Sequence, residues 1–259
     1  MSDIAFRTEV RKGVGYWLSG YKNMLRFELL NLRSFLAYAL VIQTLTGVGM
    51  AYLYGFYIGD MPDVAKLFIV TGIPALALVP IGLVMVPGSI MIHKISDTYD
   101  FVWSLPVPRT TSAAATFTLF TGLAIPGTLV ALFLAQTYYQ VDLVWSWTFV
   151  PAVLLTSLMA TSVGFGFAHA IPEPRLTNLV TNLVMFLAIL FAPIVVPIEQ
   201  FPGWWADIHR VLPFYHMAQV LRDSLSEGLT GPVDVSWLIL GSWTVGSWLL
   251  AGWVVGRRK

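Results

Sequence analysis

The sequence contains no cysteine and few charged residues. Of its 259 residues only 11% are Asp, Glu, Lys or Arg, whereas 57% are hydrophobic. Soluble domains carry about 25% charged residues, so this composition excludes an ordinary water-soluble domain. The absence of cysteine excludes disulfides and leaves the redox compartment unreadable. A net charge of +1 offers no basic patch of the kind that binds nucleic acid.

Motifs of catalysis are absent as well. No Gly-x-x-x-x-Gly-Lys-Ser/Thr phosphate loop occurs, so we expect no ATP hydrolysis on this chain. No set of nucleophile, base and orienting residue is visible, and no acidic residue lies mid-run as a proton relay would need. Asp207, His209 and His216 match no metal-ligand spacing. We therefore predict no enzyme activity, no metal site and no cofactor on this chain.

Long uncharged runs are what the sequence has instead. Six of them exceed the roughly 20 residues that a helix needs to cross the hydrocarbon core. They are Ser34–Gly59, Leu67–Ile92, Thr110–Val141, Leu143–Ile171, Leu176–Ile198 and Val235–Gly256. The connections between them are short. We predict an all-α integral membrane protein in which residues 1–259 form one transmembrane domain with six spans.

Prolines interrupt several of these runs. Proline in a membrane helix frees backbone groups that must be satisfied by protein or by water in a cavity, although simple kinking is the alternative. The second run holds Pro74, Pro80 and Pro87, the third holds Pro126, and the fifth holds Pro193 and Pro197.

Basic residues divide unequally between the two sides of the predicted spans. If both termini share one side, the other side holds only Lys66, Arg210 and Arg222, and the first side holds the remaining 12 of the 15. The positive-inside rule then places the N- and C-termini in the cytoplasm.

The segment before the first span, residues 1–33, is too charged to supply the apolar core of a signal peptide. From Tyr16 to Arg33 it has the spacing of a helix with one apolar face. That face comprises Leu18, Tyr21, Leu25, Leu29 and Leu32. Lys22, Arg26 and Arg33 flank it, where long side chains reach lipid headgroups. We predict an amphipathic interfacial helix on the cytoplasmic leaflet, with a solvated helix as the alternative.

Residues 93–109 connect the second and third runs and have the pattern of a short helix. Asp97 can cap such a helix, and Asp100 would lie in its first turn, where acidic groups favour the helix dipole. An ordered helix here suits a lever that another protein pushes on, and an ordinary capped loop helix is the alternative. The other candidate residues of this segment are Tyr99, Phe101, Trp103, Pro106, Pro108 and Arg109.

The longest predicted outer connection, residues 197–234, is too polar to cross the bilayer yet rich in aromatic residues. Two short helices fit it, Trp204–Leu212 and Pro213–Glu227, with proline at the first helical position of the second. We predict a re-entrant helical hairpin in the outer leaflet, with an ordinary aromatic belt as the alternative. Its candidate residues are Pro202, Trp204, Trp205, Pro213, Tyr215 and Arg222.

Two motifs resemble those of a known family. The stretch that ends in Leu105-Pro106-Val107-Pro108-Arg109 resembles the acidic-Gly-Thr-Leu-Glu…Leu-x-x-Pro-Val-x-Arg coupling motif, although Thr98-Tyr99-Asp100-Phe101 replaces its start. The stretch Phe201-Pro202-Gly203-Trp204-Trp205, with Leu212-Pro213-Phe214-Tyr215-His216 and Leu221-Arg222, resembles Leu-Pro-x-Trp…Asn-Pro-x-x-Tyr…Arg. With the interfacial helix and six spans, the whole chain resembles the permease subunit of a type-2 exporter-family ABC transporter.

The resemblance implies a function and partners. It implies an exporter in a prokaryotic cell (inner) membrane whose energy comes from ATP and Mg on a separate ABC ATPase subunit, present in two copies. It implies that residues 93–109 are a coupling helix in a groove of that ATPase, with Tyr99, Phe101 and Trp103 as anchors. It also implies a second copy of this chain or a related permease, with membrane lipid around the pair.

Aromatic side chains in the spans bear on the cargo. Phe117, Phe120, Phe165 and Phe186 would line a lateral path for a hydrophobic or amphiphilic, drug-like or lipid-like substrate. Aromatic rings also stack on sugars, so export of a polysaccharide or lipid-linked glycan is the alternative. An ion-coupled carrier or a non-transporting membrane sensor is the second alternative.

Overall fold

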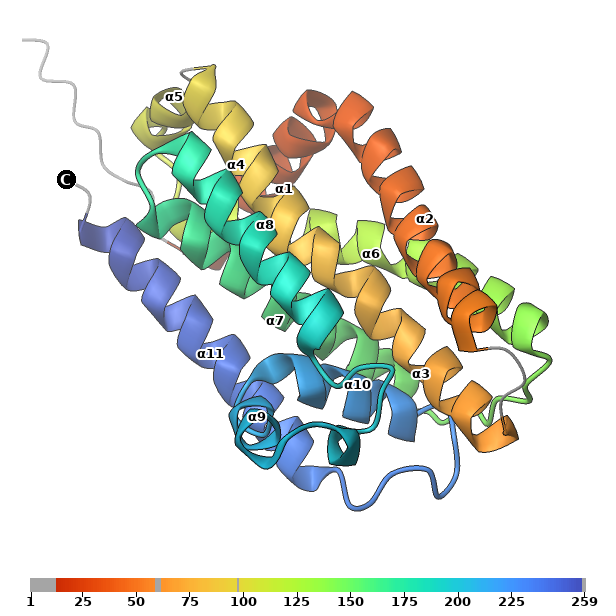
Figure 1. The fold of residues 1–259 in the computed structure, drawn as a ribbon. Helices are drawn as coiled ribbons and strands as arrows, with labels where there is room; N and C mark the ends of the chain where they lie inside the picture. Colours follow the sequence, from red (N-terminus) through yellow and green to blue (C-terminus); the bar gives the residue numbers. More distant parts are fainter. Residues whose placement is uncertain (1–12, 59–61, 97, 258–259) are drawn as a thin grey trace, which may run out of the picture.

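The computed structural model describes residues 13–58, 62–96 and 98–257, which form helices and turns without a strand among them (Figure 1). The first part of the chain forms α1 (Val14–Asn31), α2 (Arg33–Ile58), α3 (Asp63–Pro80), the π-helical turn η1 (Ile81–Met85), α4 (Val86–Ile95) and α5 (Thr98–Ser104). The rest forms α6 (Arg109–Tyr139), α7 (Phe149–Ala170), α8 (Pro174–Phe191), the 3-10 turn η2 (Ile198–Gln200), α9 (Gly203–His209), α10 (Pro213–Asp223) and α11 (Asp234–Arg257).

Five helical segments among the described residues are long and apolar enough to cross a membrane. They are Arg33–Phe56, Asp63–Ile95, Arg109–Tyr139, Phe149–Ala170 and Pro174–Phe191. The expected sixth span, α11, carries no charge between its first and last residues but is not among these five, so the count of six stays a prediction.

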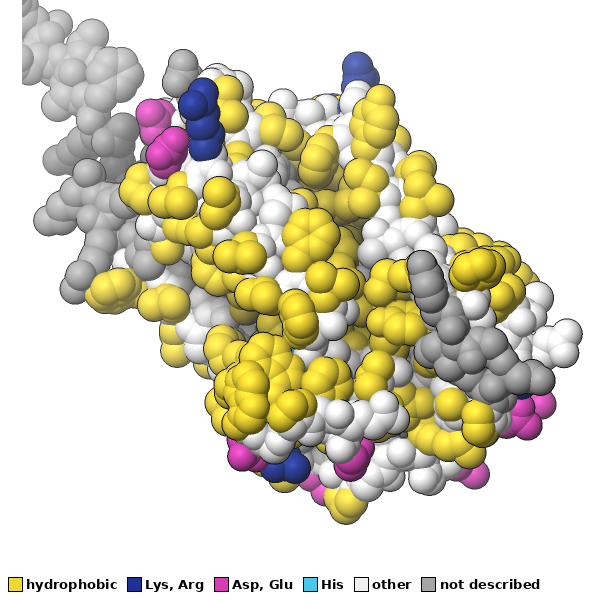
Figure 2. Space-filling model, in the orientation of Figure 1, with side chains coloured by type: hydrophobic (Ala, Val, Ile, Leu, Met, Phe, Trp, Pro, Cys, Tyr) yellow, Lys and Arg dark blue, Asp and Glu magenta, His cyan; other side chains and the backbone are white. Residues whose placement is uncertain are grey.

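The helices run between two opposite ends of the molecule, which we call the α5 end and the α10 end (Figure 1). Figure 2 shows charged side chains gathered toward these ends and a largely hydrophobic band between them. That distribution suits a molecule whose middle faces lipid tails, where an unpaired charge is costly.

The segment Asp63–Ile95, in which α3, η1 and α4 follow one another without a gap, is the centre of the fold. Of its most apolar stretch 83% is buried, against 22% for α2 and 17% for α8. The helices α2, α6, α7 and α10 all contact α3. α2 and α8 therefore lie at the margin of the protomer and present apolar faces outward.

Close backbone packing fixes α7 against η1. A Cβ atom added to Gly164 would lie 1.8 Å from the carbonyl oxygen of Gly82, a distance that no side chain can occupy. The π-helical turn starts directly after Pro80, consistent with the lost hydrogen bond and ring clash that proline imposes on a regular α-helix. The second span is thus continuous through Pro80, with its irregular backbone covered by α7.

Several boundaries differ from the sequence-based expectation. α8 ends at Phe191, so Pro193 and Pro197 follow the fifth span and do not break it. The predicted interfacial helix ends at Asn31, and Arg33 begins α2. The two short helices of residues 197–234, Gly203–His209 and Pro213–Asp223, are shorter than predicted.

Candidate functional site

α5 lies in the turn between the second and third candidate spans, as a separate short helix. Ser96 ends α4, and its Oγ lies 2.9 Å from Oγ1 of Thr98, the first residue of α5. Asp100 lies in the first turn of α5. Asp97, the predicted cap, lies outside the described residues. A side-chain hydrogen bond between Ser96 and Thr98 therefore joins the two helices.

The two aromatic residues of α5 whose side chains are described point in different directions. Tyr99 packs against the hydrophobic core, whereas Phe101 is 57% exposed. The side chain of Trp103 lies outside the described part of the chain. α5 is thus fixed to the protein through Tyr99 and presents Phe101 outward.

Lys94 connects the base of α5 to the end of α7. Its Nζ donates to the carbonyl oxygens of Ala168 (2.6 Å) and Ile171 (3.0 Å), which belong to the C-terminal end of α7. A cation there satisfies carbonyl groups that the helix leaves unpaired and complements its dipole. The same Nζ lies 5.8 Å from the ring centroid of Tyr99, and that ring lies 5.9 Å from the ring of His169 on α7.

α1 lies along the first half of α6, directly after α5. Three hydrogen bonds from aromatic side chains of α1 hold it there. They run from Tyr16 Oη to the carbonyl of Pro106, from Trp17 Nε1 to Thr110 Oγ1 (2.9 Å) and from Tyr21 Oη to Thr118 Oγ1 (2.9 Å). The exit from α5 is therefore held by α1 as well as by its own prolines.

A small hollow of about 230 Å³ lies where α5 passes into α6. Pro108 precedes the first residue of α6, Arg109, and both line this hollow. The other lining residues are Val102, Leu105, Val107 and Ser112. The passage from α5 into α6 therefore offers a concave surface.

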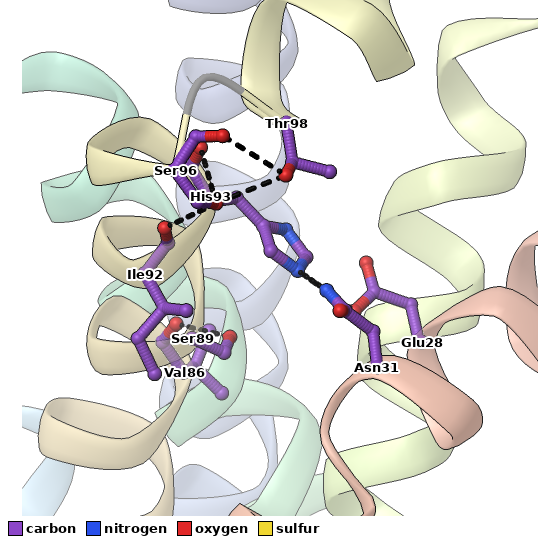
Figure 3. A network of polar contacts seen from close by, with 8 residues as sticks. All are labelled: Glu28, Asn31, Val86, Ser89, Ile92, His93, Ser96 and Thr98. Atoms are coloured by element: carbon purple, nitrogen blue, oxygen red, sulfur yellow. Dashed lines mark hydrogen bonds and ion pairs between the residues drawn. The ribbon is translucent and has the colours of Figure 1, made fainter.

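A buried polar cluster joins α1 to the end of α4 (Figure 3). Asn31 Nδ2 lies 2.8 Å from His93 Nε2, and Glu28 Oε2 lies 3.7 Å from the same nitrogen. All that an amide nitrogen can do here is donate, so His93 Nε2 accepts and the imidazole is neutral. Glu28 and His93 are both more than nine-tenths buried. The 3.7 Å contact is therefore a close approach of two groups and not an ion pair.

Burial also explains the protonation of Glu28. Loss of solvent disfavours the carboxylate and raises the pKa of Glu28 from 4.5 to about 7. A protonated Glu28 beside a neutral His93 leaves the cluster uncharged, which lets a carboxyl group lie between helices without a cationic partner. The cluster holds α1 to the helix that carries α5.

At the α10 end, α9 contacts the end of α8, and α10 packs on α3, α7 and α11. Pro202 directly precedes α9, and Pro213 is the first residue of α10. Trp205 Nε1 donates to the carbonyl of Phe191, the last residue of α8, over 3.0 Å. Trp204 is 65% exposed. α9 is therefore tied to α8 on one side and exposes a large apolar ring on the other.

α10 is linked to its surroundings by neutral hydrogen bonds. Within α10, Gln219 Nε2 donates to Tyr215 Oη over 2.6 Å, and the bonds to its neighbours come from His216. His216 Nε2 lies 2.8 Å from the carbonyl of Arg210 and must donate, so Nδ1 accepts from Ser236 Oγ at 2.9 Å. Both ring nitrogens of His216 are thus used in joining α9, α10 and α11.

Arg222 is fully buried at the inner face of α10. Its Nη2 donates to the carbonyl oxygens of Ile194, just beyond α8, and Phe68 in α3, and its guanidinium stacks 3.5 Å from the centroid of the Phe68 ring. Among the described residues no carboxylate lies within ion-pair distance of it. One cation therefore joins α3, α8 and α10 through carbonyl groups and a ring face.

A groove of about 560 Å³ separates α2 from α8, with η1 and α4 as its floor. In the orientation of Figures 1 and 2 it lies on the near face, between the teal and orange-red helices. Its lining comprises Phe35, Tyr38, Ala39, Ile42, Thr46, Met50, Pro80, Val84, Met85, Gly88, Met91, Asn178, Asn182, Met185, Phe186, Ile189 and Leu190. The groove has the size of a small-molecule site.

The sequence matches a known family over most of its length. The model of the family described as ABC-2 type transporter matches residues 20–225, which include α5, the groove and α10. This chain belongs to the ABC-2 type transporter family. A search of curated proteins gave no match. The ABC-2 chain is accordingly a multi-pass membrane component of a transporter, a class that is generally not catalytic.

In the ABC-2 chain α1 carries its basic residues outward. Lys22, Arg26 and Arg33 are exposed, the last of them as the first residue of α2. Leu18 and Leu29, predicted for the lipid-facing side, are also exposed. The buried residues of α1 are Gly20, Met24 and Glu28. Contact of α1 with lipid headgroups stays a prediction.

The four phenylalanines predicted for the substrate path lie in two places. Phe120 is fully buried, and Phe117 and Phe165 are nearly so and make an edge-to-face pair 5.4 Å apart. Phe186 is 56% exposed and lines the groove. Of the four, Phe186 has the position that the predicted role requires in the protomer.

Sequence reasoning did not select Lys94, His93 or Glu28 as functional. Lys94 and His93 lie in the segment 93–109, but their partners on α7 and α1 are far away in sequence. Glu28 carried a usable signal, because it is the one acidic residue in α1 and lies one turn after the buried Met24. A single carboxyl group on a buried helix face indicates a polar joint.

Proposed function

We propose that this chain is the transmembrane subunit of an ATP-driven ABC exporter. Two copies of the chain would form the translocation pathway, and two copies of a separate ATPase subunit would bind ATP and Mg. The chain would lie in a prokaryotic inner membrane with the α5 end and both termini in the cytoplasm. Its cargo would be hydrophobic or amphiphilic, drug-like or lipid-like.

The observation that carries this proposal is the two-sided construction of α5. Phe101 is available to a partner, whereas Tyr99 is packed on the core and Lys94 holds the end of α7. A force on α5 would reach α7 through Lys94. It would also reach α1, and with it α6, through the hydrogen bond from Tyr16 to the carbonyl of Pro106. A loop without a mechanical role needs no such attachments.

The groove between α2 and α8 supports a pathway between two copies. Both flanking helices are poorly covered in the protomer, and α8 exposes a continuous apolar stripe. That stripe comprises Leu176, Leu179, Leu183, Phe186, Leu187 and Leu190. A second copy packed there would close the groove laterally, and symmetric pairs are the commonest assemblies.

The test is to purify the tagged chain with its ATPase and to measure ATP-driven transport in vesicles. Phe101→Ala is compared with Trp204→Ala, which removes an equally exposed aromatic ring from the opposite end. Loss of an interface anchor typically costs 2 kcal/mol or more, so we expect Phe101→Ala to weaken association roughly 30-fold and transport with it. Trp204→Ala should leave association unchanged.

The outcomes distinguish the competing functions. A chain that purifies alone, or vesicles that transport on a proton gradient without ATP, would contradict the exporter proposal. Equal association for Phe101→Ala and Trp204→Ala would contradict docking through α5. Basal hydrolysis by the ATPase serves as the internal control, because Phe101 belongs to the permease and touches no nucleotide.

A further inference from the structure

The α2–α8 groove is lined mainly by apolar side chains, with a few polar and no charged ones among the described residues. Among the described residues that line it there is no Asp, Glu, Lys, Arg or His. Its polar side chains are those of Tyr38, Thr46, Asn178 and Asn182. Thr46 Oγ1 donates to the carbonyl of Ile42 in its own helix over 2.8 Å. Three residues are therefore left to address a ligand by hydrogen bonding.

These three residues all lie in the half of the groove nearer the α5 end. α2 and α8 both start at that end, with Arg33 and Pro174. At about 1.5 Å per residue, Tyr38, Asn178 and Asn182 lie within roughly 12 Å of those starts, less than half of a hydrocarbon core of about 30 Å. Beyond Asn182 the groove side of α8 is apolar.

The two asparagines leave a donor and an acceptor toward the groove. Asn182 Nδ2 donates to the carbonyl of Asn178 (2.8 Å) and to its Oδ1 (2.6 Å). Within the described structure, Asn178 Nδ2 and Asn182 Oδ1 then remain without a hydrogen-bond partner. One neutral donor and one neutral acceptor suit a head group that has hydroxyl or amide functions.

Methionine supplies much of the apolar part. Met50, Met85, Met91 and Met185 line the groove and come from α2, η1, α4 and α8. Methionine is unbranched and flexible, and methionine-rich surfaces rearrange to accept ligands of different shape. The apolar half is therefore suited to tails or ring systems of variable outline.

We propose that the groove selects uncharged amphiphiles, whose hydrogen-bonding head lies at Asn178 and Asn182 and whose apolar body lies against the methionines. This substrate class rests on the proposed function, in which the groove is part of the export pathway. A formally charged head would leave water for a site without a countercharge, which is unfavourable. A neutral head exchanges water hydrogen bonds for those of the asparagines.

The test uses photoreactive probes that share one diazirine-bearing acyl tail and differ in the head: a glycerol ester, a carboxylate and a trimethylammonium. The full chain in lipid nanodiscs is labelled without ATP or ATPase, and the labelled peptides are mapped by mass spectrometry. We expect the glycerol probe to label the α2 and α8 peptides at least about tenfold more than either charged probe.

A charge placed in the groove should reverse this selectivity. Asn182→Asp should raise groove labelling by the trimethylammonium probe at least about tenfold relative to the glycerol probe. Thr137→Asp is the matched control, because Thr137 is exposed on α6 away from the groove. An equal response of the two variants would show that general surface charge governs labelling and would overturn the proposal.

Two further results would also overturn it. Equal groove labelling by all three heads would mean that the lining does not select for charge. Absence of groove labelling by every probe would mean that a second copy of the chain fills the groove. The labelling needs no ATP, so it tests the substrate class separately from the exporter function. Selective labelling without ATP-driven transport would refute the exporter function alone. Transport without selective labelling would refute the substrate class alone.

Discussion

Lys94 Nζ donates to the carbonyl oxygen of Ala168 over 2.6 Å, although 74 residues separate the two in sequence. The bond joins the last turn of α4 to the last turn of α7. α5 begins four residues after Lys94, so this contact and the packing of Tyr99 fix α5 to the centre of the fold. A displacement of α5 would therefore move α4 and α7 together.

Replacement of Lys94 by methionine should loosen this joint. Methionine keeps much of the length but cannot donate to Ala168 or Ile171, and charge-assisted hydrogen bonds contribute about 2 kcal/mol. We expect a lower thermal unfolding temperature in detergent and less transport per ATP hydrolysed. Lys22→Met, on the exposed side of α1, should change neither quantity. Equal behaviour of the two variants would contradict a role for Lys94 in transmission.

The buried carboxyl group of Glu28 should make stability depend on pH. Its pKa is about 7 in the folded chain and 4.5 as the ordinary value. Between these values the folded state holds a proton on Glu28 that the unfolded chain has lost, so the contribution of Glu28 to stability falls as pH rises from 4.5 to 7 and is constant above. The loss amounts to about 3 kcal/mol. Thermal unfolding between pH 4 and 8 measures it.

Glu28→Gln isolates that effect, because glutamine keeps the shape without the proton equilibrium. The variant should lose the slope between pH 4.5 and 7 and should exceed the parent in stability at pH 8. Glu173→Gln, at an exposed glutamate before α8, should leave the slope intact. Persistence of the full slope in Glu28→Gln would show that another group is responsible.

Single cysteines can test the orientation, since the chain has none of its own. Trp147→Cys lies in the connection between α6 and α7 at the α10 end, and Phe101→Cys lies at the α5 end; both parent side chains are well exposed. With both termini inside, a membrane-impermeant maleimide on intact cells should label Trp147→Cys alone. Labelling of Phe101→Cys in intact cells would reverse the assignment.

Composition and run length predicted the helical membrane fold, because the bilayer leaves a long uncharged stretch few alternatives. The helical state of residues 98–104 and the short helix that begins at Pro213 were also visible in local signals such as Asp100 and the proline itself. These signals are contained within a few neighbouring residues, and for that reason sequence inspection found them.

Contacts between distant segments were not accessible in this way. The role of Lys94 depends on where α7 ends, and that of Glu28 depends on how α1 lies against α4. Hydrophobic periodicity also did not find the protein-facing side of α1, where Gly20, Met24 and Glu28 are buried. The pattern cannot tell a lipid-facing stripe from a protein-facing one when both surroundings are apolar.

The contact of α7 with η1 should not tolerate even a methyl group. Gly164→Ala would place a Cβ 1.8 Å from the carbonyl oxygen of Gly82, so the helices must separate. Gly166→Ala is the matched control, with nothing within 4 Å of its Cβ. Alanine itself favours a helix by up to about 1 kcal/mol, so Gly166→Ala should be neutral or stabilising. We expect Gly164→Ala to lower the unfolding temperature clearly, and equal temperatures would contradict the described packing.

Arg222 should matter more to stability than its lack of an acidic partner suggests. Arg222→Ala removes the largest fully buried side chain and leaves the carbonyl of Ile194 without its donor. Cavity and unpaired acceptor together should cost about 3 kcal/mol or more. Arg222→Met refills the space without the hydrogen bonds and should recover part of that loss. Arg210→Met, at an exposed pair with Asp207, should stay within about 0.5 kcal/mol of the parent. A stability of Arg222→Met equal to or above that of the parent would contradict this prediction. It would mean that the cost of desolvating the guanidinium cancels its hydrogen bonds, so that Arg222 serves only to fill space.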